Sequence, residues 1–297
     1  MKFISLSGGL GNQLFIYAFC LELRKLGQNA VLFKPNILGS ASCDHQGYEL
    51  KKLFNIKEHN GFKSLICSNL LSLYAFSLKL MPISRREKLL NLINVYSVKV
   101  PLNFIFYPDI FSFKHQNEIY WGTWQSEKYF SNSKKDVKNA FQFNRKMLSK
   151  SNIEIGKQIN SENSISIHIR RGDYLTSPHG VGFVNICSLD YYLKAIDYIN
   201  ERIIEPKYYI FTDDFDWATN NFFIDNAEYV NINKDENSWQ DMYLMSQCKH
   251  NIIANSSFSW WGAWLNNNSE KIVIAPKKWW EYFDKDDVVP DDWIKLD

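Results

Sequence analysis

Residues 164–174, which read SISIHIRRGDY, hold side chains that could bind an anion. Isoleucine alternates with polar residues here, which predicts a strand on which His168 and Arg170 share one face. Arg171 follows at the end of that strand, and Asp173 comes shortly after, within reach of both guanidinium groups. The stretch therefore predicts a cluster of charges at a strand terminus.

The two adjacent arginines have two interpretations. A guanidinium group presents a fork of donors that matches the oxygens of a phosphate or a carboxylate, so Arg170 and Arg171 would form a clamp for a diphosphate. The alternative is an internal salt bridge with Asp173, because Arg is almost never buried without a partner. Both interpretations stay open at this point, and the clamp is our working hypothesis.

Composition and charge exclude some classes of protein. The chain of 297 residues is long enough for two domains, and its hydrophobic content of 45% allows a large core. The formal net charge of +2 argues against a nucleic-acid-binding protein, which would show a strong basic excess. The five cysteines are odd in number and none has CxxC spacing, so a reducing cytoplasm is expected.

The sequence also bears on membrane association. Polar and glycine residues from Gly8 to Gln13 interrupt any apolar segment of a signal peptide. No apolar run reaches the roughly 18 residues of a transmembrane helix, so none is expected. Residues 65–81 and the basic residues that follow, up to Lys88, form either a helix pair, which we favour, or a basic amphipathic surface that rests on an anionic membrane.

A glycine-rich turn at residues 8–12 follows a short predicted strand and precedes a helix with a broad apolar face. Leu14 stands where a dinucleotide-binding GxGxxG motif has its third glycine, which argues against an NAD-dependent oxidoreductase. Gly9 and Gly11 would still let the backbone approach a ligand at the helix N-terminus. Asn12 is either a helix cap or a ligand contact.

The C-terminal half alternates between strand and helix patterns. This alternation predicts a parallel sheet with helices on both faces. The polar stretch 157–163 is the expected linker, so the predicted domains are 1–156 and 157–297, and the acidic tail 284–297 is expected to be a solvated surface. The expected strands are 30–33, 119–125, 165–170, 208–211, 228–232, 251–254 and 272–275, and the expected helices are 136–150, 189–202, 216–223, 238–247 and 259–265.

Polar side chains gather at the predicted strand ends, where parallel α/β sheets bind their ligands. Ser256 and Ser257 start a predicted helix, where they offer hydroxyl and N–H groups to an anion or simply cap the helix. The full set is Arg170, Arg171, Asp173, Thr212, Asp213, Asp214, Asn255, Ser256 and Ser257. Because three strands of one sheet carry these residues, they are expected to converge.

One pattern would indicate a metal. Asp214-Phe215-Asp216 matches the DxD motif with which many sugar transferases hold Mn²⁺ or Mg²⁺. The same aspartates start a predicted helix, where capping and the helix dipole favour Asp, and we prefer that interpretation. The six histidines lack ligand spacing, so no zinc site is expected.

Three motifs together resemble those of the bacterial α-1,2-fucosyltransferases, glycosyltransferase family 11. They are GGLGNQLF at 8–15, HIRRGDY at 168–174 and NSSFSWWGAW at 255–264. The serine–tryptophan motif is the most specific, whereas the HxRRxD pattern is shared with α-1,6- and protein O-fucosyltransferases. Leu14 and Ile16 depart from the family's usual Met and Gln.

The resemblance implies a GT-B fold, an α/β fold of two Rossmann-like domains with a cleft between them. The N-terminal domain would lie on the acceptor side, and the C-terminal domain would bind GDP-L-fucose without a metal or other cofactor. Arg170 would contact the diphosphate, His168 and Asp241 would read guanine, and Asn12 would reach across from the N-terminal domain. The other implied or candidate donor contacts are Arg171, Asn255, Ser256, Ser257, Phe258, Asp213, Gly9 and Gly11.

The implied reaction moves L-fucose, with inversion, to the 2-hydroxyl of a β-linked galactose on an oligosaccharide or lipid-linked surface glycan such as an O-antigen. The catalytic residues would be Arg170, Asp173 and Asn12. Asp173 either orients the arginines, which we favour, or acts as a base, although a carboxylate beside two cations is a poor one. The enzyme would work in the cytoplasm or at the inner face of the membrane. The rival hypotheses are a metal-dependent DxD transferase and a non-catalytic glycan- or nucleotide-binding protein.

Overall fold

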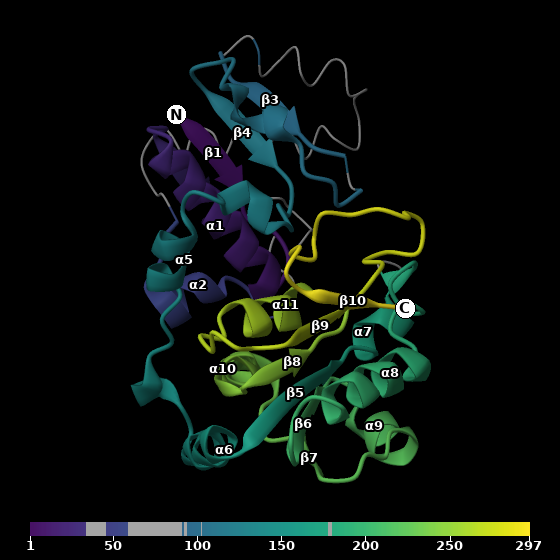
Figure 1. Cartoon of the computed structure of the whole chain (residues 1–297). Coiled ribbons are helices and arrows are strands. Elements are labelled where there is room, and N and C mark those ends of the chain that lie inside the picture. Colours follow the sequence, from purple (N-terminus) through teal and green to yellow (C-terminus); the bar gives the residue numbers. More distant parts are fainter. Residues whose placement is uncertain (34–45, 59–90, 92–93, 102, 178–179) are drawn as a thin grey trace. The chain divides into compact units, whose positions relative to one another are not determined.

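The computed structural model in Figure 1 describes all residues except 34–45, 59–90, 92–93, 102 and 178–179. The chain divides into two compact units, Met1–Phe143 and Asn144–Asp297, which are described one at a time. The stretch 65–88, with its two alternative interpretations, lies outside the described residues. In the part of the chain that is described, no helix is both long enough and apolar enough to cross a bilayer.

Unit 1 is built on a four-stranded parallel sheet with the strand order β2-β1-β4-β3. The strands are β1 (Lys2–Ser5), β2 (Ala30–Phe33), β3 (Tyr96–Lys99) and β4 (Glu118–Trp121). Its described helices are α1 (Leu10–Lys25), α2 (Glu49–Phe54) and α5 (Lys134–Ala140). The apolar face predicted for the first helix is confirmed, because Leu14, Phe15 and Phe19 of α1 are fully buried.

The turn between β1 and α1 requires glycine at one position. Gly8 has φ +71°, and a Cβ there would lie 2.5 Å from Nδ2 of Asn12. A side chain at this position would therefore strain the backbone and collide with Asn12.

Unit 2 is built on a six-stranded parallel sheet with the strand order β10-β9-β8-β5-β6-β7. The strands are β5 (Asn163–Ile169), β6 (Pro206–Thr212), β7 (Ala227–Val230), β8 (His250–Ile252), β9 (Val273–Pro276) and β10 (Ile294–Leu296). The described helices are α6 (Lys150–Ser161), α7 (Gly172–Thr176), α8 (Leu189–Asn200), α9 (Phe215–Asn221), α10 (Trp239–Gln247) and α11 (Ser257–Trp264). The α/β class and the parallel sheet expected from the sequence are confirmed.

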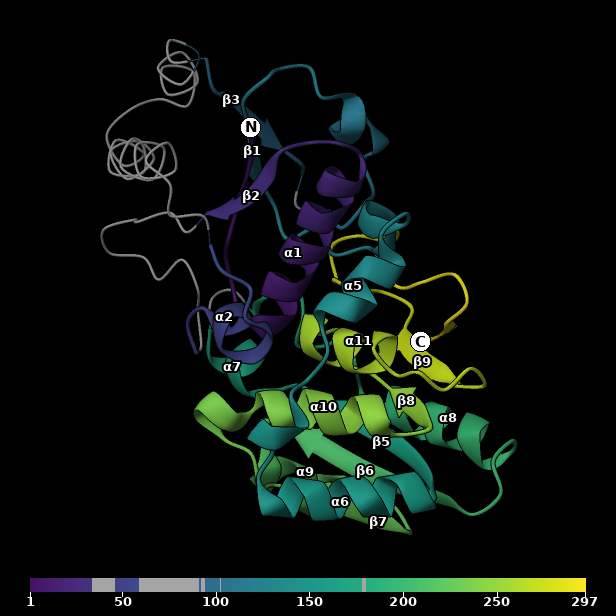
Figure 2. The ribbon, with the colours of Figure 1, turned by 90° about the vertical axis from the view of Figure 1, so that its left-hand side faces the viewer.

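The alternating pattern of β5 separates two faces of this sheet. Ile165, Ile167 and Ile169 are buried in a core that they share with residues of α8 and α9. Figures 1 and 2 show α8 and α9 on one face of the sheet, and α6 and α10 on the other. On that second face Ser166 accepts a hydrogen bond from Asn251, and His168 lies beside Phe258 of α11. Polar residues of β5 thus share the face away from the isoleucine core.

Two sequence-based expectations about residues 136–163 differ from the structure. The units divide at 143/144, not at 156/157, because the polar stretch 157–163 is the end of α6 and the start of β5. The helix expected at 136–150 is present only over its first residues, since α5 ends at Ala140 and α6 begins only at Lys150. Lys157, Gln158 and Asn160 lie on the exposed face of α6, and composition alone did not distinguish such a helix face from a linker.

The C-terminal tail also corrects an expectation. Residues 284–297 were expected to be a solvated surface, but Val288, Val289 and Trp293 are buried and β10 extends the sheet. Val288 accepts a hydrogen bond from the buried indole of Trp260. The expectation failed because it rested on the many acidic residues of the tail, whereas the few apolar residues, Val288, Val289 and Trp293, pack into the fold.

Two helical glycines of unit 2 provide a test of how tightly α11 is held. A Cβ at Gly262 of α11 would lie 2.9 Å from Cβ of Met245 in α10, whereas one at Gly156 of α6 would meet Leu244 at an ordinary 3.8 Å. Gly262→Ala should lower the free energy of unfolding by about 1–3 kcal/mol, because the two helices must separate.

Gly156→Ala is the matched control, and it should raise the free energy of unfolding by up to about 1 kcal/mol, since Ala favours a helix and no contact is violated. Urea unfolding of both variants measures these changes. An unchanged unfolding midpoint for Gly262→Ala would show that the α10–α11 contact tolerates expansion.

Candidate active site

The strand register of β5 and β6 brings two arginines to two aspartates. Ile169 pairs with Thr212 at the last rung of the ladder, so the residues that follow each strand emerge side by side. Nη1 of Arg170 lies 3.0 Å from Oδ2 of Asp213, and Nη2 lies 2.8 Å from Oδ2 of Asp173. The predicted contact between Arg170 and Asp173 is therefore present, and Asp213 adds a second carboxylate.

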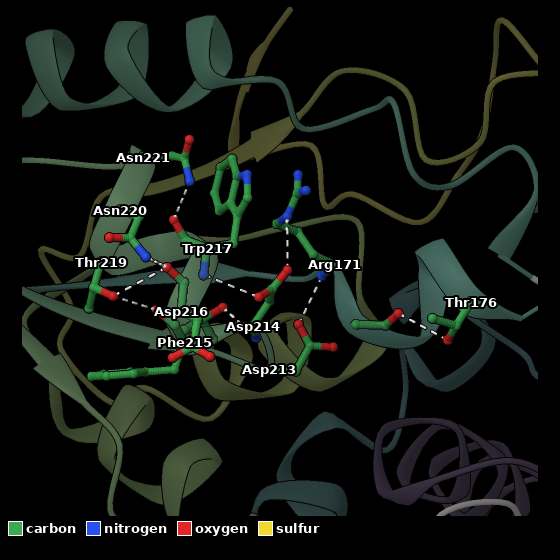
Figure 3. A network of polar contacts seen from close by, with 12 residues as sticks. Arg171, Thr176, Asp213, Asp214, Phe215, Asp216, Trp217, Thr219, Asn220 and Asn221 are labelled. Atoms are coloured by element: carbon green, nitrogen blue, oxygen red, sulfur yellow. Dashed lines mark hydrogen bonds and ion pairs between the residues drawn. The ribbon is translucent and has the colours of Figure 1, made fainter.

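Arg171 is held by a different set of contacts, which Figure 3 shows. Its backbone N–H donates to Oδ1 of Asp213 at 2.8 Å, and its Nε donates to Oδ2 of Asp214 at 3.3 Å. Its guanidinium carbon lies 3.8 Å from the ring centroid of Trp217, which is a close cation–π contact. The carboxylate of Asp213 thus contacts both arginines: it binds the guanidinium group of Arg170 and the backbone N–H of Arg171.

The two guanidinium groups keep donors for a ligand. Nε of Arg170 is buried and has no hydrogen-bond partner among the described residues. Burial disfavours the charge of Arg170, but Asp213 and Asp173 outweigh it, so its pKa is raised and it stays a cation. The side chains of Arg170 and Arg171 are 21% and 28% exposed, which leaves both accessible to an anion. The salt bridge and the clamp are therefore compatible.

His168 is a neutral, buried neighbour of this cluster. The residue is 5% exposed, its Nδ1 has no partner among the described residues, and its ring centroid lies 5.9 Å from that of Phe258. Burial and the charge of Arg170 lower the pKa of His168 to about 4, so the imidazole is neutral near pH 7. A neutral imidazole offers one donor and one acceptor, which suits it to read a heterocycle rather than a phosphate.

Asp241 lies in the first turn of α10 and is held by an asparagine pair. Nδ2 of Asn233 donates to Oδ1 of Asp241 at 2.7 Å, and the amides of Asn233 and Asn152 bond to each other at 2.7 and 2.8 Å. Burial raises the pKa of Asp241 to about 7, and the hydrogen bond from Asn233 only partly opposes this. Asp241 therefore changes its charge near neutral pH.

The residues at the start of α11 divide into two roles. Oγ of Ser256 accepts from the N–H of Phe258 at 3.3 Å and so caps the helix, with Ser257 as the first helical residue. The amide of Asn255 donates to the carbonyl oxygens of Phe183 and Trp279 at 3.0 and 3.2 Å. Asn255 thus holds loops together, and its Nδ2 is committed to those carbonyls.

The residues predicted in the glycine turn belong to unit 1. Asn12 does not cap α1, because the N-cap residue is Gly9 and no side chain bonds there, whereas Gly11 already lies in the first turn of the helix. Oδ1 of Asn12 instead accepts from Nε2 of Gln125 at 2.6 Å. The reach of Asn12 toward a donor stays a prediction.

Sequence reasoning missed the residue that shapes this turn. The amide of Gln13, fully buried, donates to the carbonyl oxygens of Gly8 and Gly47 and accepts from the N–H of Glu49. The sequence carried a signal for Gln13, because a buried polar residue on the apolar face of a helix must have hydrogen-bond partners. Gln13 ties the glycine turn to the start of α2.

The aspartates of the DxD pattern act as expected for a helix start. Oδ1 of Asp214 accepts from the N–H of Trp217 at 3.2 Å, which caps α9, while its other oxygen binds Arg171 (Figure 3). Across the described residues, no three His, Cys, Asp or Glu side chains are grouped so that they could hold a metal ion. The capping interpretation of Asp214 is confirmed.

Two further residues were missed, each with a detectable signal. Asn233 follows β7, so the rule that selected the other strand ends would also have selected it. Trp217 lies three residues after Asp214, in the first turn of a helix that begins at a strand end, where an aromatic ring can cover a cation.

Comparison with known proteins supplies the family. The family model of Glycosyl transferase family 11 matches residues 2–297. The O-antigen biosynthesis glycosyltransferase WbnK of Escherichia coli is 34% identical over 307 residues, covering 98% of this chain and 99% of that protein. An alpha-1,2-colitosyltransferase of Escherichia coli is 32% identical over 305 residues, covering 98% and 97%.

More distant similarities are shorter or weaker. Galactoside alpha-(1,2)-fucosyltransferase 1 of Leontocebus fuscicollis is 25% identical over 103 residues, which are 34% of this chain and 28% of that protein. The crystal structure of NodZ alpha-1,6-fucosyltransferase soaked with GDP-fucose matches with a TM-score of 0.47 and 14% identity, over 89% of this chain and 92% of that one. The full-length match to the family model, together with two relatives above 30% identity, shows that this chain belongs to glycosyltransferase family 11.

Proposed function

We propose that this glycosyltransferase is a galactoside α-1,2-fucosyltransferase, which moves L-fucose from GDP-L-fucose to the 2-hydroxyl of a β-linked galactose. The observation that carries the proposal is the pair of guanidinium groups held by aspartates at the carboxyl edge of a parallel sheet. Relatives named as an alpha-1,2-colitosyltransferase and as alpha-(1,2)-fucosyltransferases support the linkage.

The donor would bind through unit 2. The free Nε of Arg170 and the terminal nitrogens of Arg171 would donate to the diphosphate, and Ser256 and Ser257 would add the N-terminal end of α11. His168 and Asp241 would read guanine, because a carboxylate accepts from the ring N–H groups that distinguish guanine from adenine. Phe258 beside His168 would line the pocket for fucose.

The chemistry follows from where charge develops. Breaking the bond between sugar and phosphate gives the sugar oxocarbenium character and leaves negative charge on the departing GDP. Arg170, fixed by Asp173 and Asp213, would stabilise that charge more strongly in the transition state than in the ground state. Two guanidinium groups can neutralise the diphosphate, so we propose that the reaction needs no metal.

The proposed setting is the synthesis of a surface glycan. WbnK, a relative that matches over 99% of its length, is named as an O-antigen biosynthesis glycosyltransferase. We place this enzyme in the cytoplasm, where sugar nucleotides and lipid-linked acceptors at the inner membrane face would meet.

The donor and the acceptor can be tested together. Incubation with GDP-L-fucose and lactose in the presence of EDTA should yield a trisaccharide whose new linkage, read by NMR, is α-1,2 to galactose. Transfer that requires Mn²⁺ or Mg²⁺ would favour the metal-dependent alternative, and binding without a product would favour a non-catalytic protein. GDP-colitose, run in parallel, tests the donor that the colitosyltransferase relative suggests.

Arg170→Lys should lose nearly as much activity as Arg170→Ala. A Lys ammonium cannot span Asp213 and Asp173 while it also donates to a diphosphate, since it lacks the planar fork. Removing such a donor lowers kcat by roughly 100- to 1,000-fold, and steady-state kinetics of both variants measures the loss.

Arg202→Lys is the matched control, because Arg202 of unit 2 is exposed and pairs with Glu201. It should keep the kcat of the unaltered enzyme. Near-normal turnover of folded Arg170→Lys would remove Arg170 from the mechanism.

Donor binding should depend on pH through Asp241. The carboxylate must be ionised to accept from guanine, and its pKa is raised to about 7 by burial. Since only the ionised fraction binds, the Kd for GDP-fucose should weaken about tenfold from about pH 8 to about pH 6. GDP-fucose is the right probe, because its diphosphate has no free terminal phosphate that titrates in this range.

Asp241→Asn removes the titrating group, so its Kd, although weaker, should not change over the same range. His168, with a pKa of about 4, stays neutral throughout and does not contribute. Isothermal titration calorimetry of both proteins without an acceptor measures the difference. A slope that persists in Asp241→Asn would assign the pH dependence to another group.

A further inference from the structure

A cavity in unit 1 lies where the carboxyl ends of three neighbouring strands meet. Ser7 follows β1, Lys99 ends β3 and Trp121 ends β4, and these strands are adjacent in the order β1-β4-β3. In a parallel sheet this edge is where ligands bind. The cavity has a volume of about 350 Å³, within the range of small-molecule sites, and Gly122, Trp124 and Tyr129 complete much of its wall.

Two tryptophans in this wall have indole N–H groups without a hydrogen-bond partner among the described residues. Nε1 of Trp121 and Nε1 of Trp124 are both buried, and neither finds a hydrogen-bond acceptor among the described residues. Trp124 is only 2% exposed. A buried indole N–H usually has a partner, and leaving one unpaired costs about 1–3 kcal/mol. Both residues line the same cavity, so a ligand whose acceptor oxygens reached these donors would satisfy them.

The ring of Trp124 is held firmly despite this cost. It stacks on Phe19 with centroids 4.2 Å apart and meets Tyr129 edge-on at 5.4 Å. A Cβ at Gly122 would lie 3.1 Å from the indole, so glycine makes room for it. Trp124 also has φ +53°, in the left-handed region that costs a non-glycine residue energy. Rigid, strained residues that face a cavity are typical of binding sites.

The lining defines the chemistry of the ligand. Phe104, Trp121, Trp124 and Tyr129 provide aromatic surface, and Lys99 is the charged residue among the described ones that line the cavity. A single cation does not match a phosphate ester, whereas unpaired N–H donors beside aromatic rings match a neutral ring that carries hydroxyl groups. The neutral polyhydroxylated ring is therefore the favoured occupant.

We propose that this cavity, lined by Trp121 and Trp124, binds a pyranose ring of the acceptor glycan. The indole N–H groups donate to its hydroxyl or ring oxygens, and the aromatic rings pack against its C–H faces. This inference rests on the proposed function for the choice of sugar, a galactoside, but binding by the cavity does not require the donor.

The test measures binding of lactose and N-acetyllactosamine to the whole chain without any donor, by saturation-transfer NMR and titration. Trp121→Phe keeps an aromatic ring but removes the N–H, so the Kd for the bound galactoside should rise about fivefold or more, the loss of one hydrogen bond. Trp124→Phe should act in the same direction. Trp280→Phe is the matched control, because the Trp280 indole of unit 2 already donates to the carbonyl oxygen of Val181, and it should leave the Kd unchanged.

Three results separate this inference from the proposed function. An unchanged melting temperature and GDP-fucose affinity would show that the Trp121→Phe and Trp124→Phe proteins are folded. If these folded variants also kept the galactoside Kd of the unaltered protein, the inference would be overturned. So would the absence of any galactoside binding at millimolar concentration. Binding that depends on Trp121 but yields no fucosylated product would support the cavity and contradict the fucosyltransferase proposal.

Discussion

The site depends on the alignment of two neighbouring strands. Because Ile169 of β5 stands opposite Thr212 of β6, the residues that leave the sheet next are arginines from one strand and aspartates from the other. A shift of one residue would turn the isoleucines of β5 out of the core and would separate Arg170 from Asp213. The burial of the isoleucine face therefore fixes the register, and the register fixes the charge cluster.

This arrangement explains how an anion site can exist before its ligand arrives. Two cations at a half-buried strand end would repel each other and lose hydration, which disfavours the folded state. Asp173, Asp213 and Asp214 offset that cost, and they also hold the guanidinium groups in fixed orientations. The same carboxylates that stabilise the empty site leave Nε of Arg170 free, so a ligand adds contacts to a cluster that already exists.

The two units differ in the chemistry that they offer. Unit 2 gathers cations and buried polar groups whose pKa values are shifted, namely His168 and Asp241. Unit 1 offers aromatic surface and unpaired indole donors at the carboxyl edge of its own sheet. The first set suits a charged nucleotide and the second a neutral sugar, which are the two kinds of substrate that a glycosyltransferase must hold.

Local sequence patterns were sufficient to predict some of the strands, one helix cap and the family of this protein. The alternation of Ile165, Ile167 and Ile169 determined the strand and its two faces, because side-chain direction along a strand is a local property. The motifs at 8–15, 168–174 and 255–264 determined the family, which the full-length match confirms. Local rules also identified Asp214 as a helix cap.

Other features were decided only by the tertiary structure, because they join residues that are far apart in the sequence. Asn233 meets Asn152 and Asp241 only after α6 and α10 have packed, so neither the asparagine pair nor the burial that shifts the pKa of Asp241 could be inferred locally. The acidic tail is part of the sheet because Val288 and Trp293 are buried in the fold. A sequence shows which side chains can donate or accept, but whether Trp121 and Trp124 find partners depends on what the folded chain places beside them.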